Sequence, residues 1–143
     1  MALLAVATSV EHNTLSTFAY QQLQHFDLSA AQLQEALESA AIVAMLNIYY
    51  RFQHMVDKPT DYAQAALRMT ALAKPNLGKA RFEMLAFAVS VINGCEKCIG
   101  AHEQVLRDHA VSIEKIHDLA RLAAIVKGVK MLDYTLLLSN AAP

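Results

Sequence analysis

The 143-residue chain has few of the residues that interrupt helices. It contains four glycines, three prolines and no tryptophan, and only 17% of its residues are charged. Strand-like alternation of polar and apolar residues is absent, which disfavours a β-sheet protein. The net charge of -1, without a basic run or an acidic tail, gives no reason to expect nucleic acid or an anionic membrane as a partner.

Hydrophobic residues make up 55% of the chain, more than is usual. With so few charges, part of the apolar surface is expected to be covered by another subunit, so we expect a homo-oligomer. The longest apolar run, near AAIVAMLNIYY, is about half the length that a membrane span needs. The start, MALLAVATSVEHN, lacks the basic residues of a targeting segment. We therefore expect a cytoplasmic protein with no membrane partner.

Helical periodicity runs through nearly the whole chain and predicts one all-α domain over residues 1–143, with about six to eight helices. Ser29 and Gln32 form an S-x-x-Q capping box before a long helix that ends near Val56. Asn93 and Gly94 end a helix that is apolar on every side and is therefore expected to be buried. Two further helices are predicted at 11–25 and 61–73. Another runs from the cysteines to about residue 109. The last two cover 112–127 and, after a break at Gly128, the residues up to 138.

Both cysteines of the chain stand in the stretch GCEKCIGAH, residues 94–102. Cys95 falls in the first turn of a predicted helix, where free N–H groups and the helix dipole favour negative charge. The pKa of a cysteine at such a position falls from about 8.5 to between about 3.5 and 7.5. Cys98 lies one turn further on, and His102 follows it at i+4 on the same face. A thiol next to an imidazole that takes its proton is a candidate nucleophile.

A CxxC pair in the cytosol is more often catalytic or metal-binding than a permanent disulfide. Closing a disulfide between Cys95 and Cys98 is expected to distort the first turn slightly, which makes the bond easy to reduce again. Glu83, at the head of the buried helix, is a candidate general base, because burial is expected to raise its pKa. Antiparallel packing around Asn93-Gly94 places Glu83 far from the turn, so the sequence does not bring it beside the thiols.

Simpler interpretations exist for these residues. Cys95, Cys98 and His102 could ligate zinc, but no second CxxC or HxxxH offers a fourth ligand, so we expect no metal and no bound cofactor. Both cysteines could be buried and inert, and Glu83 could serve only as a partner of Lys79. The remaining histidines share no spacing and are interpreted as structural or exposed; they are His12, His25, His54, His109 and His117.

The aromatic stretch Tyr49, Tyr50 and Arg51 follows a buried segment. Aromatic side chains in such a place most often fill a core or an interface. We therefore predict a packing role for these three residues.

The spacing E-x11-C-x2-C-x3-H, made by Glu83, Cys95, Cys98 and His102, resembles the alkylhydroperoxidase D proteins of the carboxymuconolactone decarboxylase superfamily. The surrounding NLGKARFEMLAFAVSVINGCEKCIGAHEQVLR and LARLAAIVKGV are similar too, and the resemblance extends from about residue 40 to 129. A CxxC alone is weak evidence, whereas four residues at this spacing are specific. The resemblance implies an all-helical fold, assembly as a trimer or a hexamer, and a thiol peroxidase.

The resemblance also implies a role for each residue. Cys98 looks like the peroxidatic cysteine and Cys95 the resolving one, with His102 and Glu83 as the relay that removes the proton from Cys98 through a bound water. The substrate is then an organic hydroperoxide, and the electron donor is a dithiol such as dihydrolipoamide or a lipoylated protein. Lys97 stands where some relatives have a histidine, and a lysine cannot relay protons at neutral pH. The N-terminal part also looks shorter than in such relatives, and we expect this difference to affect assembly.

Two other functions are compatible with parts of this pattern. A thiol–disulfide oxidoreductase or redox sensor with weak peroxidase activity would form the same disulfide, but protein disulfides would oxidise it faster than peroxide. A non-redox member of the superfamily, either a decarboxylase-like enzyme or an oligomeric binding module, has no evident use for a dithiol. The preferred hypothesis is therefore a dithiol-dependent peroxidase in antioxidant defence.

Overall fold

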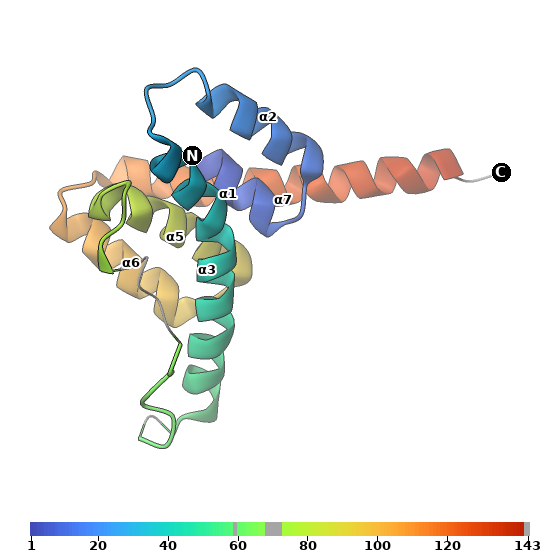
Figure 1. Cartoon of the computed structure of the whole chain (residues 1–143). Coiled ribbons are helices and arrows are strands. Elements are labelled where there is room, and N and C mark those ends of the chain that lie inside the picture. The colour runs from blue at the N-terminus through green and yellow to red at the C-terminus, as the bar shows by residue number, and fades with distance from the viewer. Residues whose placement is uncertain (59, 68–72, 142–143) are drawn as a thin grey trace.

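The computed structural model describes residues 1–58, 60–67 and 73–141, and within these ranges the chain forms α-helices and no strand. The predicted all-α fold is confirmed. Figure 1 labels the helices, which are α1 (Ala2–Ser9), α2 (Asn13–Leu23), α3 (Ala30–Val56), α5 (Lys79–Asn93), α6 (Glu96–Asp108) and α7 (Ile113–Ala141). None of the helices in the described ranges is long and apolar enough to cross a membrane.

Helix α5 is the centre of the fold, and α1, α3, α6 and α7 all pack against it. One side of α5 contributes Phe82, Leu85 and Val89 to a core shared with α1 and α3. The other side contributes Phe87 and Ala88 to a second core, shared mainly with α6 and α7. A helix that buries apolar side chains in two directions must be apolar on every side, as the sequence predicts for this segment.

The start of α3 has the predicted capping box. Ser29 Oγ accepts from the backbone N–H of Gln32 at 3.2 Å, and Gln32 Oε1 accepts from the backbone N–H of Ser29 at 3.0 Å. One turn later the buried carboxylate of Glu35 accepts from the backbone N–H groups of Asn76 at 2.9 Å and Leu77 at 2.7 Å. These bonds anchor the segment that leads into α5 against α3.

The helix predicted at 11–25 corresponds to α2, but the sequence prediction missed α1 before it. The chain forms α1 and then α2, separated by a turn in which Glu11 has φ of 56°. Because α1 is buried over Leu4 to Ala7, it shows no polar face that would give helical periodicity. His12 ends the turn as the N-cap of α2, and its side chain accepts from the backbone N–H of Leu15.

The predicted helix at 61–73 is wrong over residues 61–67, which are not helical. Residues 68–72 lie outside the described ranges. The carbonyl oxygen of Tyr62 accepts from Gln53 Nε2 at 2.6 Å and from Tyr49 Oη at 3.1 Å, and Ala66 has φ of 51°. Hydrogen bonds to α3 thus outweigh the helix propensity of this alanine-rich segment.

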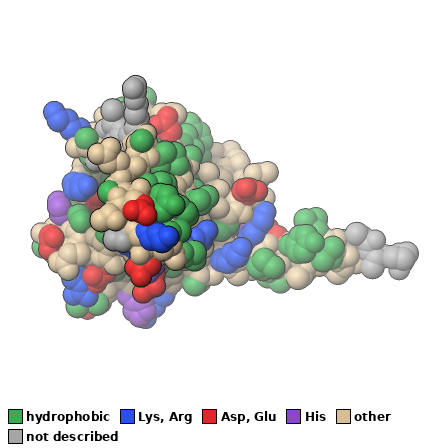
Figure 2. Space-filling view, turned by 90° about the horizontal axis from the view of Figure 1, so that it is seen from below, with side chains coloured by type: hydrophobic (Ala, Val, Ile, Leu, Met, Phe, Trp, Pro, Cys, Tyr) green, Lys and Arg blue, Asp and Glu red, His purple; other side chains and the backbone are tan. Residues whose placement is uncertain are grey.

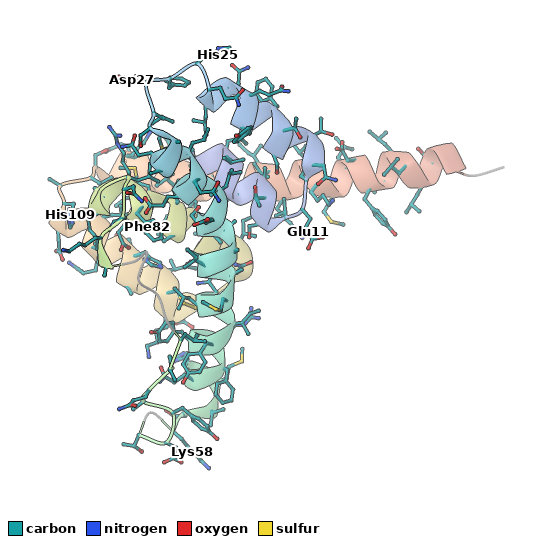
Figure 3. All side chains as sticks on the ribbon, viewed as in Figure 1. Glu11, His25, Asp27, Lys58, Phe82 and His109 are labelled. Carbon is teal, nitrogen blue, oxygen red and sulfur yellow. A yellow bond between two sulfur atoms is a disulfide. The ribbon has the colours of Figure 1, made fainter. Side chains whose placement is uncertain are left out.

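The break predicted at Gly128 is also wrong, because α7 runs without interruption from Ile113 to Ala141. Its first half is partly buried, and from Met131 to Ser139 every residue is exposed. Figure 1 shows this second half projecting beyond the other helices, and Figure 2 shows hydrophobic side chains along it. The second half of α3 also extends away from the body, to the tip marked by Lys58 in Figure 3.

Candidate active site

The turn between α5 and α6 places the two cysteines. Gly94 ends α5 in the left-handed conformation, with φ of 61°, and Cys95 is the N-cap of α6. The backbone N–H of Cys95 donates to the carbonyl oxygen of Ser90 at 3.2 Å, which closes the end of α5. The predicted cap and the predicted helix start are both confirmed.

Cys95 and Cys98 are within bonding distance of each other. Their sulfur atoms lie 2.09 Å apart and their Cα atoms 5.2 Å apart, so the structure holds the pair as a disulfide. The two residues differ in access: Cys95 is fully buried, whereas Cys98 keeps 6% of its surface exposed and lines a pocket. A small molecule that enters this pocket therefore meets Cys98 first.

The pocket has a volume of about 240 Å³ and lies between α3 and α6. Its wall consists of Leu46, Asn47, Tyr50, Lys97, Cys98, Ala101 and His102. The sequence prediction missed the wall that α3 contributes, and Tyr50 lines the pocket instead of serving only to pack a core. The available signal was Asn47, a polar residue within the apolar run AMLNIYY.

Asn47 links α3 to the turn that carries the cysteines. It is buried, its Nδ2 donates to Ser90 Oγ at 2.9 Å, and its Oδ1 accepts from Asn93 Nδ2 at 3.0 Å. Arg51, one turn further along α3, donates from Nη1 to the carbonyl oxygen of Asn93 at 2.7 Å. A buried polar side chain with both functional groups bonded fixes the position of its neighbours. The network thus holds the α5–α6 turn against the pocket wall.

Glu83 and His102 meet across the α5–α6 hairpin. Glu83 Oε2 lies 2.5 Å from His102 Nδ1, and Glu83 Oε1 lies 2.8 Å from Lys79 Nζ. Glu83 is indeed far from the turn, as antiparallel packing predicts, but His102 lies two turns into α6 and reaches back to it. The carboxylate thus contacts the histidine that shares the pocket wall with Cys98.

The pKa of Glu83 is lowered, which corrects the expectation that it is raised. Burial acts to raise the pKa of this carboxyl. The hydrogen bonds from His102 and Lys79, with the charge of Lys79 and that of His102 when it is protonated, outweigh burial and lower the pKa. Glu83 is therefore ionised at neutral pH, and His102 Nδ1 carries the hydrogen that it donates to Glu83. Nε2 is then the ring nitrogen of His102 that remains for proton transfer.

In the described part of the chain, no group of three or more His, Cys, Asp or Glu side chains is placed to hold a metal ion. The two sulfur atoms are bonded to each other, and His102 Nδ1 is engaged by Glu83. The zinc site considered from the sequence would require the bond between the two sulfur atoms to be broken first.

The chain belongs to the carboxymuconolactone decarboxylase family, whose model matches residues 59–138, more than half of its length. This range includes Glu83, both cysteines and His102. The family resemblance drawn from the spacing of these four residues is thereby confirmed.

Several curated relatives carry one name. The chain is 48% identical over 102 residues to the alkyl hydroperoxide reductase AhpD of Anaeromyxobacter dehalogenans, which covers 70% of this chain and 54% of that protein. It is 45% identical over 127 residues to the AhpD of a Bradyrhizobium species, and the matched part covers 87% of this chain and 68% of that protein. For the AhpD of a Methylobacterium species the identity is 48% over 103 residues, covering 71% and 58%. The chain thus spans little more than half the length of two of these relatives.

Proposed function

We propose that this protein is a dithiol-dependent peroxidase that reduces organic hydroperoxides. The observation that supports the proposal best is the difference between the two cysteines. Cys98 faces a pocket whose wall includes His102, while Cys95 is buried within bonding distance behind it. The curated names of the relatives agree with this chemistry.

The cycle begins with the reduced pair. His102 takes the thiol proton of Cys98, directly or through one water molecule, and Glu83 stabilises the imidazolium that forms. The Cys98 thiolate attacks the distal oxygen of the hydroperoxide. The O–O bond breaks, Cys98 becomes a sulfenic acid, and the alkoxide leaves as an alcohol with the proton held by His102.

The second half of the cycle removes the sulfenic acid. The thiol of Cys95 attacks the Cys98 sulfur, the disulfide forms, and the sulfenic oxygen leaves as water. A dithiol, such as dihydrolipoamide or a lipoylated protein, then reduces the disulfide by exchange and is itself oxidised to its cyclic disulfide. Cys98 is the sulfur that this reductant can reach through the pocket.

We also propose that residues 1–143 act as one domain within a trimer or hexamer located in the cytoplasm. The exposed apolar surface of α7, which includes Leu132, Leu136 and Leu137, supports assembly because monomeric proteins rarely expose so much apolar surface on one element. A cytoplasmic location agrees with a dithiol that must be reduced in every cycle.

A thiol count tests the proposed function. The reduced protein, freed of reductant, receives one equivalent of cumene hydroperoxide, and dihydrolipoamide is added at the end. We expect rapid loss of two thiols per chain and their return after dihydrolipoamide is added. Thiols that persist for hours under peroxide, but disappear with a protein disulfide as oxidant, would instead establish the thiol–disulfide oxidoreductase.

A further inference from the structure

One cation stands in the wall of the pocket that leads to Cys98. Lys97 lines the pocket beside Leu46, Tyr50 and Ala101, which are apolar or aromatic. Asn47 has its amide engaged by Ser90 and Asn93, as described above. The pocket is therefore apolar over most of its wall, with Lys97 and His102 as its basic side chains.

The ammonium group of Lys97 is held in place by α3 without being neutralised. Lys97 Nζ donates to Gln53 Oε1 at 3.0 Å and lies 5.7 Å from the centroid of the Tyr50 ring. Gln53 is itself fixed, because its Nε2 donates to the carbonyl oxygen of Tyr62. Both contacts hold the ammonium on the α3 side of the pocket.

No carboxylate in the described ranges lies within 4.0 Å of Lys97 Nζ. Other cations of the chain do have such partners, namely Lys79, Arg107 and Arg121. An ammonium group has three N–H donors and no acceptor, so Lys97 retains donors for a further ligand. An anion is the ligand that forms the strongest hydrogen bonds with it.

We propose that Lys97 makes the enzyme select small organic hydroperoxides that carry a carboxylate or another anionic group. The apolar wall takes the carbon skeleton, the ammonium of Lys97 binds the anion, and the peroxide reaches the adjacent Cys98. A volume of about 240 Å³ is slightly below the range of drug-sized ligand pockets, which limits the substrate to a small molecule. This inference rests on the proposed peroxidase function and adds the class of substrate.

The test compares two hydroperoxides with one skeleton: cumene hydroperoxide and its para-carboxylate derivative. Second-order rate constants for oxidation of the reduced protein are measured for each, and their ratio is the readout. A general effect of Lys97 on the Cys98 thiolate changes both rate constants alike and cancels in the ratio. The variants are Lys97→Met, Lys97→Arg, and the control Lys115→Met, which removes an exposed charge outside the pocket.

We expect the wild type to be oxidised about 1.4-fold to fivefold faster by the carboxylate, the range for one charge pair near the surface. Lys97→Met should bring the ratio to about one, Lys97→Arg should keep it above one, and Lys115→Met should leave it at the wild-type value. Added salt should reduce the wild-type ratio.

The experiment distinguishes failure of the selectivity proposal from failure of the peroxidase proposal. If wild type and Lys97→Met give the same ratio while both react rapidly, the selectivity proposal is overturned and the peroxidase stands. If neither hydroperoxide oxidises the wild-type thiols, the peroxidase itself is overturned, and the selectivity proposal with it.

Discussion

Glu83 has both carboxylate oxygens occupied, one by Lys79 and one by His102. An ionised carboxylate in that position fixes the tautomer and orientation of the histidine and stabilises its charged form. Since its pKa is lowered, Glu83 does not itself hold a proton at neutral pH. The base that we propose for Cys98 is therefore His102, with Glu83 as the residue that positions it.

Replacing each cysteine by serine is predicted to stop the catalytic cycle at a different step. Cys98→Ser should abolish peroxide consumption, because the remaining thiol is buried. Cys95→Ser should still consume about one equivalent and stop at a sulfenic acid on Cys98, which dimedone traps and mass spectrometry detects. The opposite pattern, with the trapped sulfenic acid on Cys95 in the Cys98→Ser protein, would reverse the assignment.

Glu83→Gln should slow thiol oxidation near neutral pH by about tenfold to a hundredfold, less than the roughly 10²–10⁴-fold that a complete general base supplies. The amide keeps the size of the side chain but cannot stabilise an imidazolium. Stopped-flow measurement of thiol loss gives the rate, and circular dichroism checks the fold. An unchanged rate in a folded variant would leave Glu83 with a structural role only.

The lowered pKa of Glu83 also predicts that the free energy of unfolding depends on pH. Its pKa is lower in the folded protein than the ordinary value near 4.5, so the unfolded chain binds more protons as the pH falls. The stabilisation is complete above the unfolded pKa and is lost as the pH falls through the folded one. Urea unfolding of wild type and Glu83→Gln at pH 7 and pH 3.5 should show a larger loss for the wild type. Equal losses would mean that the ion pairs of Glu83 contribute nothing to stability.

At the scale of the helix, two glycines should respond to alanine in opposite directions. Gly94 has φ of 61°, so Gly94→Ala should lower the free energy of unfolding by about 1 kcal/mol. Gly128 lies inside α7 with nothing within 4 Å of an added Cβ, so Gly128→Ala should raise it by about 0.5–1 kcal/mol. Urea unfolding followed by circular dichroism measures both changes. A stabilising Gly94→Ala would show that the turn does not need its left-handed residue.

Local signals predicted the elements that depend on local chemistry. The box at Ser29 and the end of α5 at Gly94 are properties of a few neighbouring residues, and both are confirmed. The secondary-structure predictions were wrong where contacts with residues distant in the sequence determine the local conformation. Burial removed the polar face of α1, and the side chains of Tyr49 and Gln53 hold residues 61–67 out of a helix.

The same division applies to the site. Cys95, Cys98 and His102 are separated by short helical spacings, so the sequence predicted them as a group. Glu83 joined this group only through the family resemblance. Asn47 and Tyr50 come from α3, more than forty positions before the cysteines, and no spacing rule connects them. The charge of Lys79 and the bond to His102, which together reverse the effect of burial on Glu83, likewise required the packed structure.

At the scale of the molecule, the exposed end of α7 is predicted to hold subunits together. Leu137→Glu places a charge within this apolar surface and should lower the mass measured by size-exclusion chromatography with light scattering. Gln22→Glu, at an exposed polar position of α2, is the matched control and should leave the mass unchanged. A Leu137→Glu protein of wild-type mass would place the subunit contacts elsewhere.

The uninterrupted course of α7 has a mechanical consequence. From Met131 to Ala141 the helix extends about 16 Å, and the part before it packs behind α5. Because α7 has no break at Gly128, its packed part and its exposed part form one continuous helix. A sideways force on the exposed end is therefore transmitted to the part of α7 that packs against α5.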